Sequence, residues 1–126
     1  MKIASFFSGA GGLDLGFTNA EFKLAFANDN WEGCWETFEK NHKIPINKKS
    51  ITKIKVDEVP DVVGFVGGPP CQSWSLAGAM RGINDPRGRV FYDYVRLIKE
   101  KKPSFFLAEN VAGILSSSHR NEFMNI

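Results

Sequence analysis

Cys71 has the local sequence that points most strongly to chemistry. It follows the run Gly67-Gly68-Pro69-Pro70 and precedes Gln72 and Ser73. Proline lacks a backbone N–H and glycine tolerates positive φ, so this run interrupts strands and helices and makes the backbone turn. A cysteine that only packs in a core needs no such surroundings. We interpret Cys71 as a candidate thiolate nucleophile, which nearby groups must activate; an ordinary buried thiol is the alternative.

A carboxylate follows another apolar segment of the chain. Glu109 comes directly after residues 105–108 and precedes Asn110 and Val111. At the end of a strand, Glu109 would face the same crevice as Cys71, where a carboxyl group can serve as a general acid. A surface glutamate that begins a loop is the alternative interpretation.

A glycine-rich turn, Ser8-Gly9-Ala10-Gly11-Gly12, lies near the start of the chain. Its glycines let a ligand approach the backbone, and a helix that follows offers free N–H groups to an anion. Asp29 ends the next apolar segment, where an acid commonly binds ribose hydroxyls. Together the turn and the acid favour a nucleoside ligand. The alternatives are a turn without a ligand and an Asp29 that caps a helix.

Three arginines, Arg81, Arg87 and Arg89, follow Cys71 in a long segment rich in glycine and proline. They predict either a flap that contacts phosphates or ordinary solvated charges.

These residues need elements that bring them together. Apolar patterning predicts strands over residues 2–7, 22–27, 61–66 and 105–108, and a further short strand near Ile51. Helices are expected from Leu13, over 31–41 and over 90–101, with a loop over 67–88. Alternating strands and helices predict a doubly wound α/β fold with a mainly parallel sheet. The ligand crevice of such a sheet lies beyond the carboxyl ends of its strands. The glycine-rich turn, Asp29, Cys71 and Glu109 are all expected at those ends.

The bulk composition limits the remaining possibilities. The chain has 126 residues, enough for one domain, and its net charge of +2 indicates no large basic surface. Its two cysteines, Cys34 and Cys71, form no CxxC pair, which argues against zinc and thioredoxin-type chemistry and fits a cytoplasmic protein. No apolar stretch approaches the roughly 20 residues that span a membrane. The segment from Asn110 onward has no closing strand, which predicts one part of a longer or split protein.

Taken together, the motifs resemble the DNA cytosine-C5 methyltransferases. The match comprises Phe7 to Gly12, Gly68 to Gln72, Asp85-Pro86-Arg87-Gly88 before Phe91, and Glu109-Asn110-Val111, in family order along essentially the whole chain. The stretch 68–88 is most similar to the bacterial members that modify GGCC. The resemblance implies a Rossmann-like, class I methyltransferase fold in which residues 1–126 form the N-terminal part of the catalytic domain.

The resemblance also implies a reaction. A cytosine is flipped out of double-stranded DNA, Cys71 adds to C6, Glu109 holds and protonates N3, and C5 takes a methyl group from S-adenosyl-L-methionine. No metal is implied. The implied cofactor contacts are Phe7, Ser8, Gly9, Ala10, Gly11, Gly12, Leu13, Asp29, Asn30, Ser50, Ile51 and Gly68. The implied substrate contacts are Pro70, Gln72, Ser73, Arg87, Asn110 and Val111.

The chain departs from the family pattern in three ways. Asn30 stands where members carry a large apolar side chain, and Lys49-Ser50-Ile51 stands where they carry Gly-Asp-Ile. The family's Gln-x-Arg-x-Arg segment, target-recognition domain and last helix have no counterpart here. We therefore expect this polypeptide alone to be inactive or nearly so, with a second chain carrying the missing half as one arrangement. A nucleotide-dependent oxidoreductase on the same fold and a non-catalytic subunit of a split methyltransferase are the alternatives.

Overall fold

The computed structural model describes residues 1–70 and 86–112 of the chain. Strands and helices alternate through this part, as the sequence predicts. The elements are β1 (Lys2–Phe6), α1 (Gly12–Asn19), β2 (Lys23–Asn28), α2 (Glu32–His42), the 3-10 helices η1 (Ile51–Lys53) and η2 (Val56–Glu58), β3 (Gly64–Gly67), α3 (Pro86–Lys101) and β4 (Phe105–Ala108). Within the described ranges, none of the helices has the length and apolar character needed to cross a membrane.

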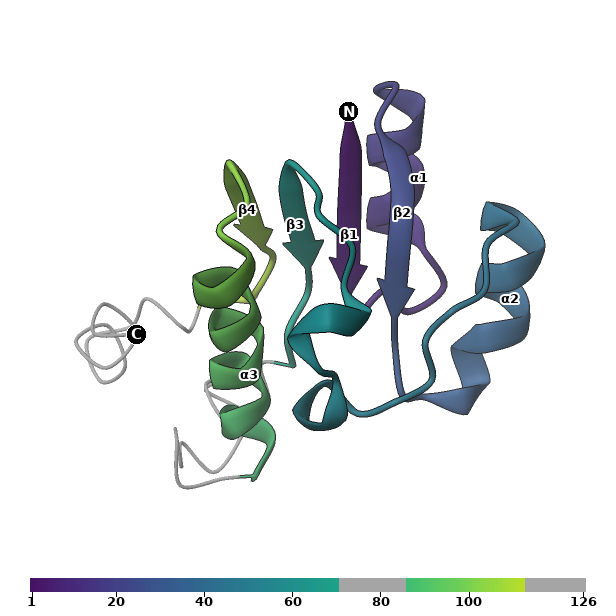
Figure 1. Cartoon of the computed structure of the whole chain (residues 1–126). Helices are drawn as coiled ribbons and strands as arrows, with labels where there is room; N and C mark the ends of the chain where they lie inside the picture. Colours follow the sequence, from purple (N-terminus) through teal and green to yellow (C-terminus); the bar gives the residue numbers. More distant parts are fainter. Residues whose placement is uncertain (71–85, 113–126) are drawn as a thin grey trace.

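The four strands form one parallel sheet in the order β2-β1-β3-β4 (Figure 1). The chain first adds β2 to one side of β1 and later crosses over to add β3 to the other side. The ends of β1 and β3 therefore flank a topological switch point, where parallel sheets of this kind leave a crevice for ligands. Phe6 is in register with Gly67 at this end, which places the glycine-rich turn beside the Gly-Pro-Pro run. The doubly wound α/β fold predicted from the sequence is confirmed.

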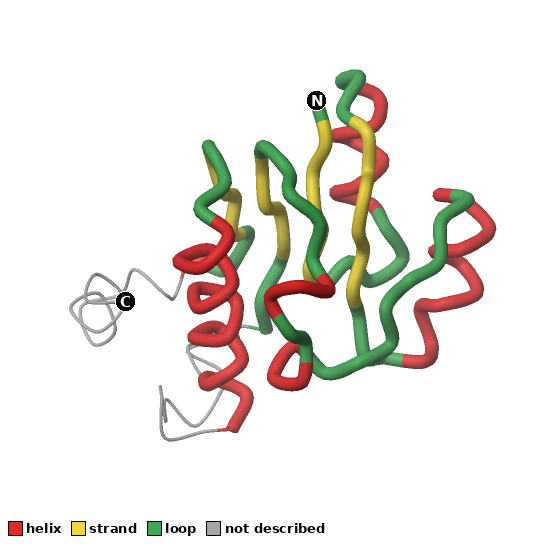
Figure 2. Tube along the Cα trace, in the orientation of Figure 1, coloured by secondary structure: helices red, strands yellow, loops and turns green. Residues whose placement is uncertain are grey.

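Helices cover both faces of the sheet. Ile3 of β1 packs on the face that carries α1 and α2, whereas Ala4 and Phe6 pack on the face that carries α3, η1 and η2. Figure 2 shows the same three layers, with α3 and the 3-10 helices in front of the strands and α1 behind them. This alternation follows from the two-residue period of a strand.

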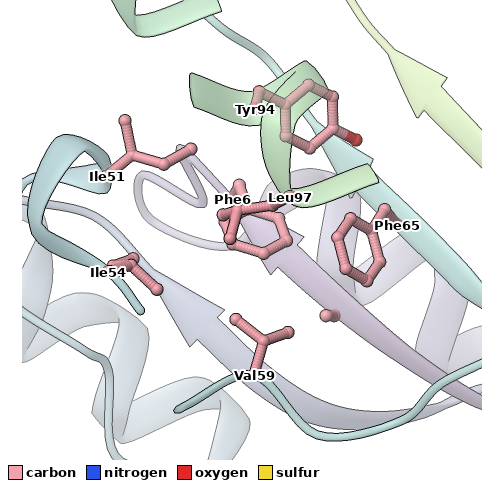
Figure 3. Close-up of a cluster of buried hydrophobic side chains, with 8 residues drawn as sticks. Phe6, Ile51, Ile54, Val59, Phe65, Tyr94 and Leu97 are labelled. Atoms are coloured by element: carbon pink, nitrogen blue, oxygen red, sulfur yellow. The ribbon is translucent and has the colours of Figure 1, made fainter. Parts of the chain in front are cut away.

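The larger apolar cluster surrounds Phe6. Its ring lies 5.0 Å from that of Phe65 and 5.5 Å from that of Tyr94, centre to centre, in tilted arrangements that aromatic pairs favour (Figure 3). The buried Tyr94 hydroxyl donates a hydrogen bond to the Leu107 carbonyl at 3.0 Å. Burial raises the pKa of Tyr94, so this donor stays neutral. The bond fixes α3 on β4, whose end carries Glu109.

Two expectations about elements are wrong. The segment at Ile51 forms a 3-10 helix and not a strand. Ile51 and Ile54 are both buried against α3, and a 3-10 turn aligns residues three apart on one side. The helix predicted to begin at residue 90 begins at Pro86, because proline suits the first turn of a helix. Arg96 of this helix donates a hydrogen bond to the Ile54 carbonyl at 3.2 Å and thereby connects α3 to the end of η1.

Trp31 is a further difference. The sequence predicts a helix over 31–41, but α2 begins at Glu32 and Trp31 is 68% exposed. Cys34 and Phe38, at helical spacing from Trp31, are buried in the cluster that includes Ile3 and Leu24. The apolar spacing therefore predicted α2 correctly but placed its start one residue too early.

Candidate active site

The turn after β1 has a tightly specified backbone. Phe7, Gly9 and Gly11 all have positive φ, at 53°, 53° and 87°. Glycine adopts this region freely, whereas a phenylalanine there costs about 1–3 kcal/mol and persists only when its surroundings hold it. Ser8 N donates to the Asn28 carbonyl at 3.1 Å, which ties the turn to the end of β2. At Gly11, a Cβ atom would overlap the imidazole of His42, so that position requires glycine.

Asp29 binds this turn through its carboxylate. Its Oδ2 accepts a hydrogen bond from Gly9 N at 2.9 Å, and its Oδ1 accepts one from Trp31 N at 2.8 Å. The residue that caps α2 is Trp31, so the alternative in which Asp29 itself caps the helix is wrong. The sequence predicted that Asp29 and the glycine-rich turn lie at the same edge of the sheet. The structure shows a direct hydrogen bond between Asp29 and Gly9 of that turn.

A cavity of about 260 Å³ lies beside the turn, and we call it the nucleoside cavity. Four of the predicted cofactor positions line it, together with the predicted substrate position Pro70 and two residues that the sequence did not single out. The lining residues are Phe7, Asn28, Asn30, Ser50, Ile51, Pro70 and Val90. Both departures from the family pattern, Asn30 and Ser50, therefore face the same space.

Asn28 explains how Ser50 reaches this cavity. Its side-chain amide donates to the carbonyls of Asn47 and Lys49, both at 2.8 Å, and it is almost fully buried. These bonds fix the segment before η1 alongside the end of β2. A strand-terminal asparagine was the available signal, but the sequence does not show which segment it binds.

A second cavity, of about 190 Å³, lies at the switch point between β1 and β3, and we call it the switch-point cavity. Five predicted site residues line it, along with four that were not predicted. The lining residues are Ser5, Phe6, Phe7, Ser8, Leu13, Asp14, Gly67, Gly68 and Glu109. Phe7 lines both cavities and thus separates them. The other predicted cofactor residues, Gly9, Ala10, Gly11, Gly12 and Asp29, line neither of the two.

Glu109 lies against the run that precedes Cys71. Its backbone N donates to the Gly67 carbonyl at 2.8 Å, and a Cβ on Gly68 would fall 3.2 Å from its Oε2. The side chain is exposed, so the burial expected for a proton donor is not found. The amide of Asn110 donates to the Pro69 carbonyl at 3.0 Å, so the two motifs are hydrogen-bonded to each other.

Several predicted residues lie outside the described part of the chain. These are Cys71, Gln72, Ser73 and Arg81. Arg87 and Arg89 lie in the first turn of α3, where only the backbone is described. Val111 is exposed, and its backbone N donates to Asn110 Oδ1 at 2.9 Å. The catalytic and substrate-binding roles of all these residues stay predictions.

Sequence reasoning missed Asp14, in the first turn of α1. Its side chain is completely buried, and neither carboxylate oxygen has a hydrogen-bond partner within the described residues. Burial raises the pKa of Asp14, although the nearby Ser5 hydroxyl and His42 oppose that shift. The one signal in the sequence for burial of Asp14 was its position between two leucines, Leu13 and Leu15. Acids in a first helical turn usually lie at the surface, near the positive end of the helix dipole.

Cys34 behaves as a structural thiol. It is 2% exposed, and its Sγ donates to the Trp31 carbonyl at 3.0 Å. Burial and the nearby Asp29 carboxylate both raise the pKa of this thiol, which suppresses the reactive thiolate. Of the two cysteines, Cys71 is therefore the candidate nucleophile.

Two other hollows in the described ranges contain none of the predicted site residues. No group of three or more histidine, cysteine, aspartate or glutamate side chains is arranged to hold a metal ion there. A wider hollow of about 360 Å³ lies beside β2, but none of its lining residues is ionisable. A further hollow of about 420 Å³ is lined by Glu32, Glu36, Glu39 and Lys48, none of which is a predicted site residue. The two cavities that meet at Phe7 are lined by predicted site residues.

Residues 1–126 match the family described as C-5 cytosine-specific DNA methylase. The chain belongs to this family. This DNA methylase chain is 70% identical over 126 residues to "Type II methyltransferase M.MthTI" of Methanothermobacter thermautotrophicus, covering 100% of the chain and 38% of that relative. It is 55% identical over 126 residues to "Type II methyltransferase M.FnuDI" of Fusobacterium nucleatum, covering 100% of the chain and 37% of that relative.

A solved structure of a putative DNA modification methyltransferase from an Escherichia coli prophage superposes on the methylase chain with a TM-score of 0.82 and 28% identity. The superposition covers 99% of this chain and 37% of that one. The methylase chain thus spans less than two fifths of the length of these relatives. The family match confirms the resemblance found in the sequence and counts against the oxidoreductase alternative.

Proposed function

We propose that this chain supplies the N-terminal catalytic part of a DNA (cytosine-5-)-methyltransferase of the restriction-modification type. The complete enzyme would transfer a methyl group from S-adenosyl-L-methionine to C5 of a cytosine in double-stranded DNA. One observation carries the proposal: Glu109 and Asn110 are hydrogen-bonded to Gly67 and Pro69 of the run that leads into Cys71.

The residues around the turn fit such a methyl donor in two parts. The nucleoside cavity offers the apolar walls of Phe7, Ile51 and Val90 to a base and the polar side chains of Asn30 and Ser50 to its edge. Asp29, at the end of β2, is the candidate for the ribose hydroxyls. The switch-point cavity would hold the amino-acid part next to Ser8, Leu13 and Gly68, with the rest of the turn presenting its backbone. When bound, S-adenosylmethionine supplies the methyl group.

Cys71 and Glu109 would perform the covalent steps. The thiolate of Cys71 donates an electron pair to C6 of the flipped cytosine, forming a C–S bond. Glu109 hydrogen-bonds N3 and gives it a proton, so negative charge does not accumulate on the ring while C5 becomes nucleophilic. After methylation, a base removes the proton from C5, the C–S bond breaks and the thiolate is restored.

Recognition of DNA would need more than these residues. Pro70, Gln72, Ser73, Arg87, Asn110 and Val111 are the candidates for contacts to the cytosine and its neighbouring phosphates. We propose that the remaining length seen in the relatives, in the same polypeptide or in a second chain, reads the target sequence. The similarity of residues 68–88 to GGCC-modifying members makes GGCC the first target to test.

A methyl-transfer assay tests this function. Residues 1–126 are fused to the remaining part of the Methanothermobacter relative, and transfer from labelled methyl donor to duplex DNA is measured. We expect transfer from the fusion and little or none from residues 1–126 alone. Cys71→Ser should lower transfer by about 10³-fold or more, because a hydroxyl replaces the thiolate.

Cys34→Ala is the matched control for that substitution. It removes the other thiol, which is buried and bonded to Trp31. We expect the Cys34→Ala fusion to retain transfer once its lower stability is allowed for. Equal transfer by the Cys71→Ser fusion and its parent would contradict the covalent role. Robust transfer by residues 1–126 alone would contradict the assignment as a catalytic part.

A further inference from the structure

Asp14 is a buried acid that the reaction above does not use. It is 0% exposed, and both of its carboxylate oxygens lack a hydrogen-bond partner in residues 1–70 and 86–112. An unpaired buried carboxylate is costly in a folded protein unless a ligand completes it. This group therefore requires an explanation beyond the packing of α1.

The cavity that Asp14 lines has a distinct electrostatic character. Two of its lining residues, Asp14 and Glu109, are acids, and none is basic. The basic side chain that acts on Asp14 electrostatically is His42 of α2, which stacks on Phe38 and makes no hydrogen bond to either Asp14 oxygen. Such a cavity attracts a cationic group and repels an anionic one.

The first turn of α1 presents two kinds of group within three residues. Gly12 and Leu13 begin the helix, where backbone N–H groups have no intrahelical acceptors, and Asp14 follows directly. A free amino acid carries its carboxylate and its ammonium on one carbon atom. The same helical turn can therefore hold the carboxylate at its N–H groups and the ammonium at the Asp14 side chain.

We propose that Asp14 binds the ammonium group of the amino-acid part of the methyl donor. This inference rests on the proposed function and adds a residue that selects ligands with a free amino group. The ammonium offers three N–H donors to a carboxylate that lies beside the Ser5 hydroxyl but has no partner at full hydrogen-bond geometry in the described residues. Ser5, whose Oγ accepts a hydrogen bond from Ser8 Oγ at 2.9 Å, lies beside Asp14 and acts to lower the pKa that burial raises.

Calorimetric binding of three adenosine ligands to the 126-residue chain tests the proposal. S-adenosylhomocysteine carries the ammonium, its deaminated analogue lacks only that group, and 5′-methylthioadenosine lacks the whole amino-acid part. We expect Asp14→Asn to weaken S-adenosylhomocysteine about 10- to 100-fold, as loss of a charged hydrogen bond does, and to leave the other two ligands unchanged. Asp57→Asn, which changes an exposed acid in η2, is the control and should alter none of the three affinities.

The outcomes separate this proposal from the one on which it rests. Unchanged binding of S-adenosylhomocysteine by Asp14→Asn would overturn the ammonium site and leave the methyl-donor assignment intact. An equal loss for all three ligands would overturn it too, because Asp14 would then only maintain the fold. Failure of the unmodified chain to bind any of the three would overturn both proposals.

Thermal unfolding without ligand gives an independent readout. The pKa of Asp14 is raised above its ordinary value of 3.8, so the folded state binds more protons than the unfolded state between these two values. Stability should therefore fall as pH rises from about 3.8 through the raised pKa of Asp14. The other ionisable side chains that face Asp14 or its cavity in the described residues are His42 and Glu109. Asp14→Asn should remove the Asp14 part of that decline and melt no lower than the parent at neutral pH. A variant that melts well below the parent would show that Asp14 is needed for the ligand-free fold and would overturn the ammonium site.

Discussion

Ser50 and Asn30 give the nucleoside cavity two polar walls. The family pattern that the sequence resembles implies an acid at residue 50 and a large apolar side chain at residue 30. Replacing Ser50 with aspartate should bind S-adenosylhomocysteine about tenfold more tightly, because a carboxylate accepts a stronger hydrogen bond from the amino group of adenine than a hydroxyl does. Calorimetry on the 126-residue chain measures the change.

Asn19→Asp provides the comparison for Ser50→Asp. Asn19 is exposed at the end of α1, so this variant adds the same charge away from the cavity. Its affinity for S-adenosylhomocysteine should equal that of the parent. If Ser50→Asp binds no better than Asn19→Asp, the edge of the adenine does not lie at residue 50.

Some site residues owe their positions to the strands that they follow, and these could be predicted from the sequence, whereas others depend on tertiary contacts. Phe7, Ser8, Gly68 and Glu109 could be predicted to meet, because each follows a strand and parallel strands end at one edge. The burial of Asp14 could not be predicted, because it depends on contacts between α1 and residues of other elements, such as Ser5 of β1, which lines the same cavity. No local pattern encodes such contacts.

At the level of elements, the close approach of β1 and β3 shapes the site. A Cβ on Gly67 would lie 2.5 Å from the Phe6 carbonyl oxygen, its register partner. Gly67→Ala should therefore separate the two strand ends, lower the free energy of unfolding by about 1–3 kcal/mol and weaken binding of S-adenosylhomocysteine. Urea unfolding and calorimetry provide the two measurements.

Gly16→Ala is the control for the same chemical change in a helix. Gly16 lies inside α1, and a Cβ there would meet no atom within 4 Å. Alanine at this exposed helical position should raise the free energy of unfolding by about 0.5–1 kcal/mol. A Gly67→Ala protein as stable as its parent would show that β1 and β3 have room to accommodate a methyl group.

The elements themselves follow closely from apolar periodicity, with informative exceptions. The pattern around Ile51 is compatible with a strand or a helical turn, and only the packing of Ile51 and Ile54 under α3 selects the 3-10 form. The contacts of Arg96 could not be predicted, because its acceptors, the carbonyls of Ile51 and Ile54, lie more than 40 residues away in the chain. In both cases the structure depends on contacts between residues that are distant in the sequence, which the local pattern does not show.

At the scale of the whole molecule, the outer edge of β4 has no neighbouring strand in the described ranges, and apolar side chains are exposed there. β4 is the terminal strand, and Phe106 and Leu107 are 60% and 36% exposed. Open edges with apolar side chains promote association between chains. Phe106→Lys should reduce light scattering of the 126-residue chain at high concentration while changing its melting temperature little, because the ring contributes little buried area.

The same substitution tests how the longer relatives use this edge. In the fusion with the Methanothermobacter segment, Phe106→Lys should destabilise the protein by more than about 1 kcal/mol if added residues cover the ring. Equal effects on the fusion and on residues 1–126 would show that the ring stays exposed in both. The strand order β2-β1-β3-β4 on which this argument depends was not available from the sequence, because alternating elements fit several orders.

The central position of β1 has a consequence for synthesis. β1 precedes both of its partners in the chain and pairs on both sides, with Leu24 opposite Ile3 on one edge and Gly64 on the other. The second partner is translated about 60 residues later, a delay of roughly 3–12 s at ordinary elongation rates. During that interval the nascent chain can complete only one of the two ladders. The β3 edge of β1 therefore stays without its partner strand until residues 64–67 have been translated.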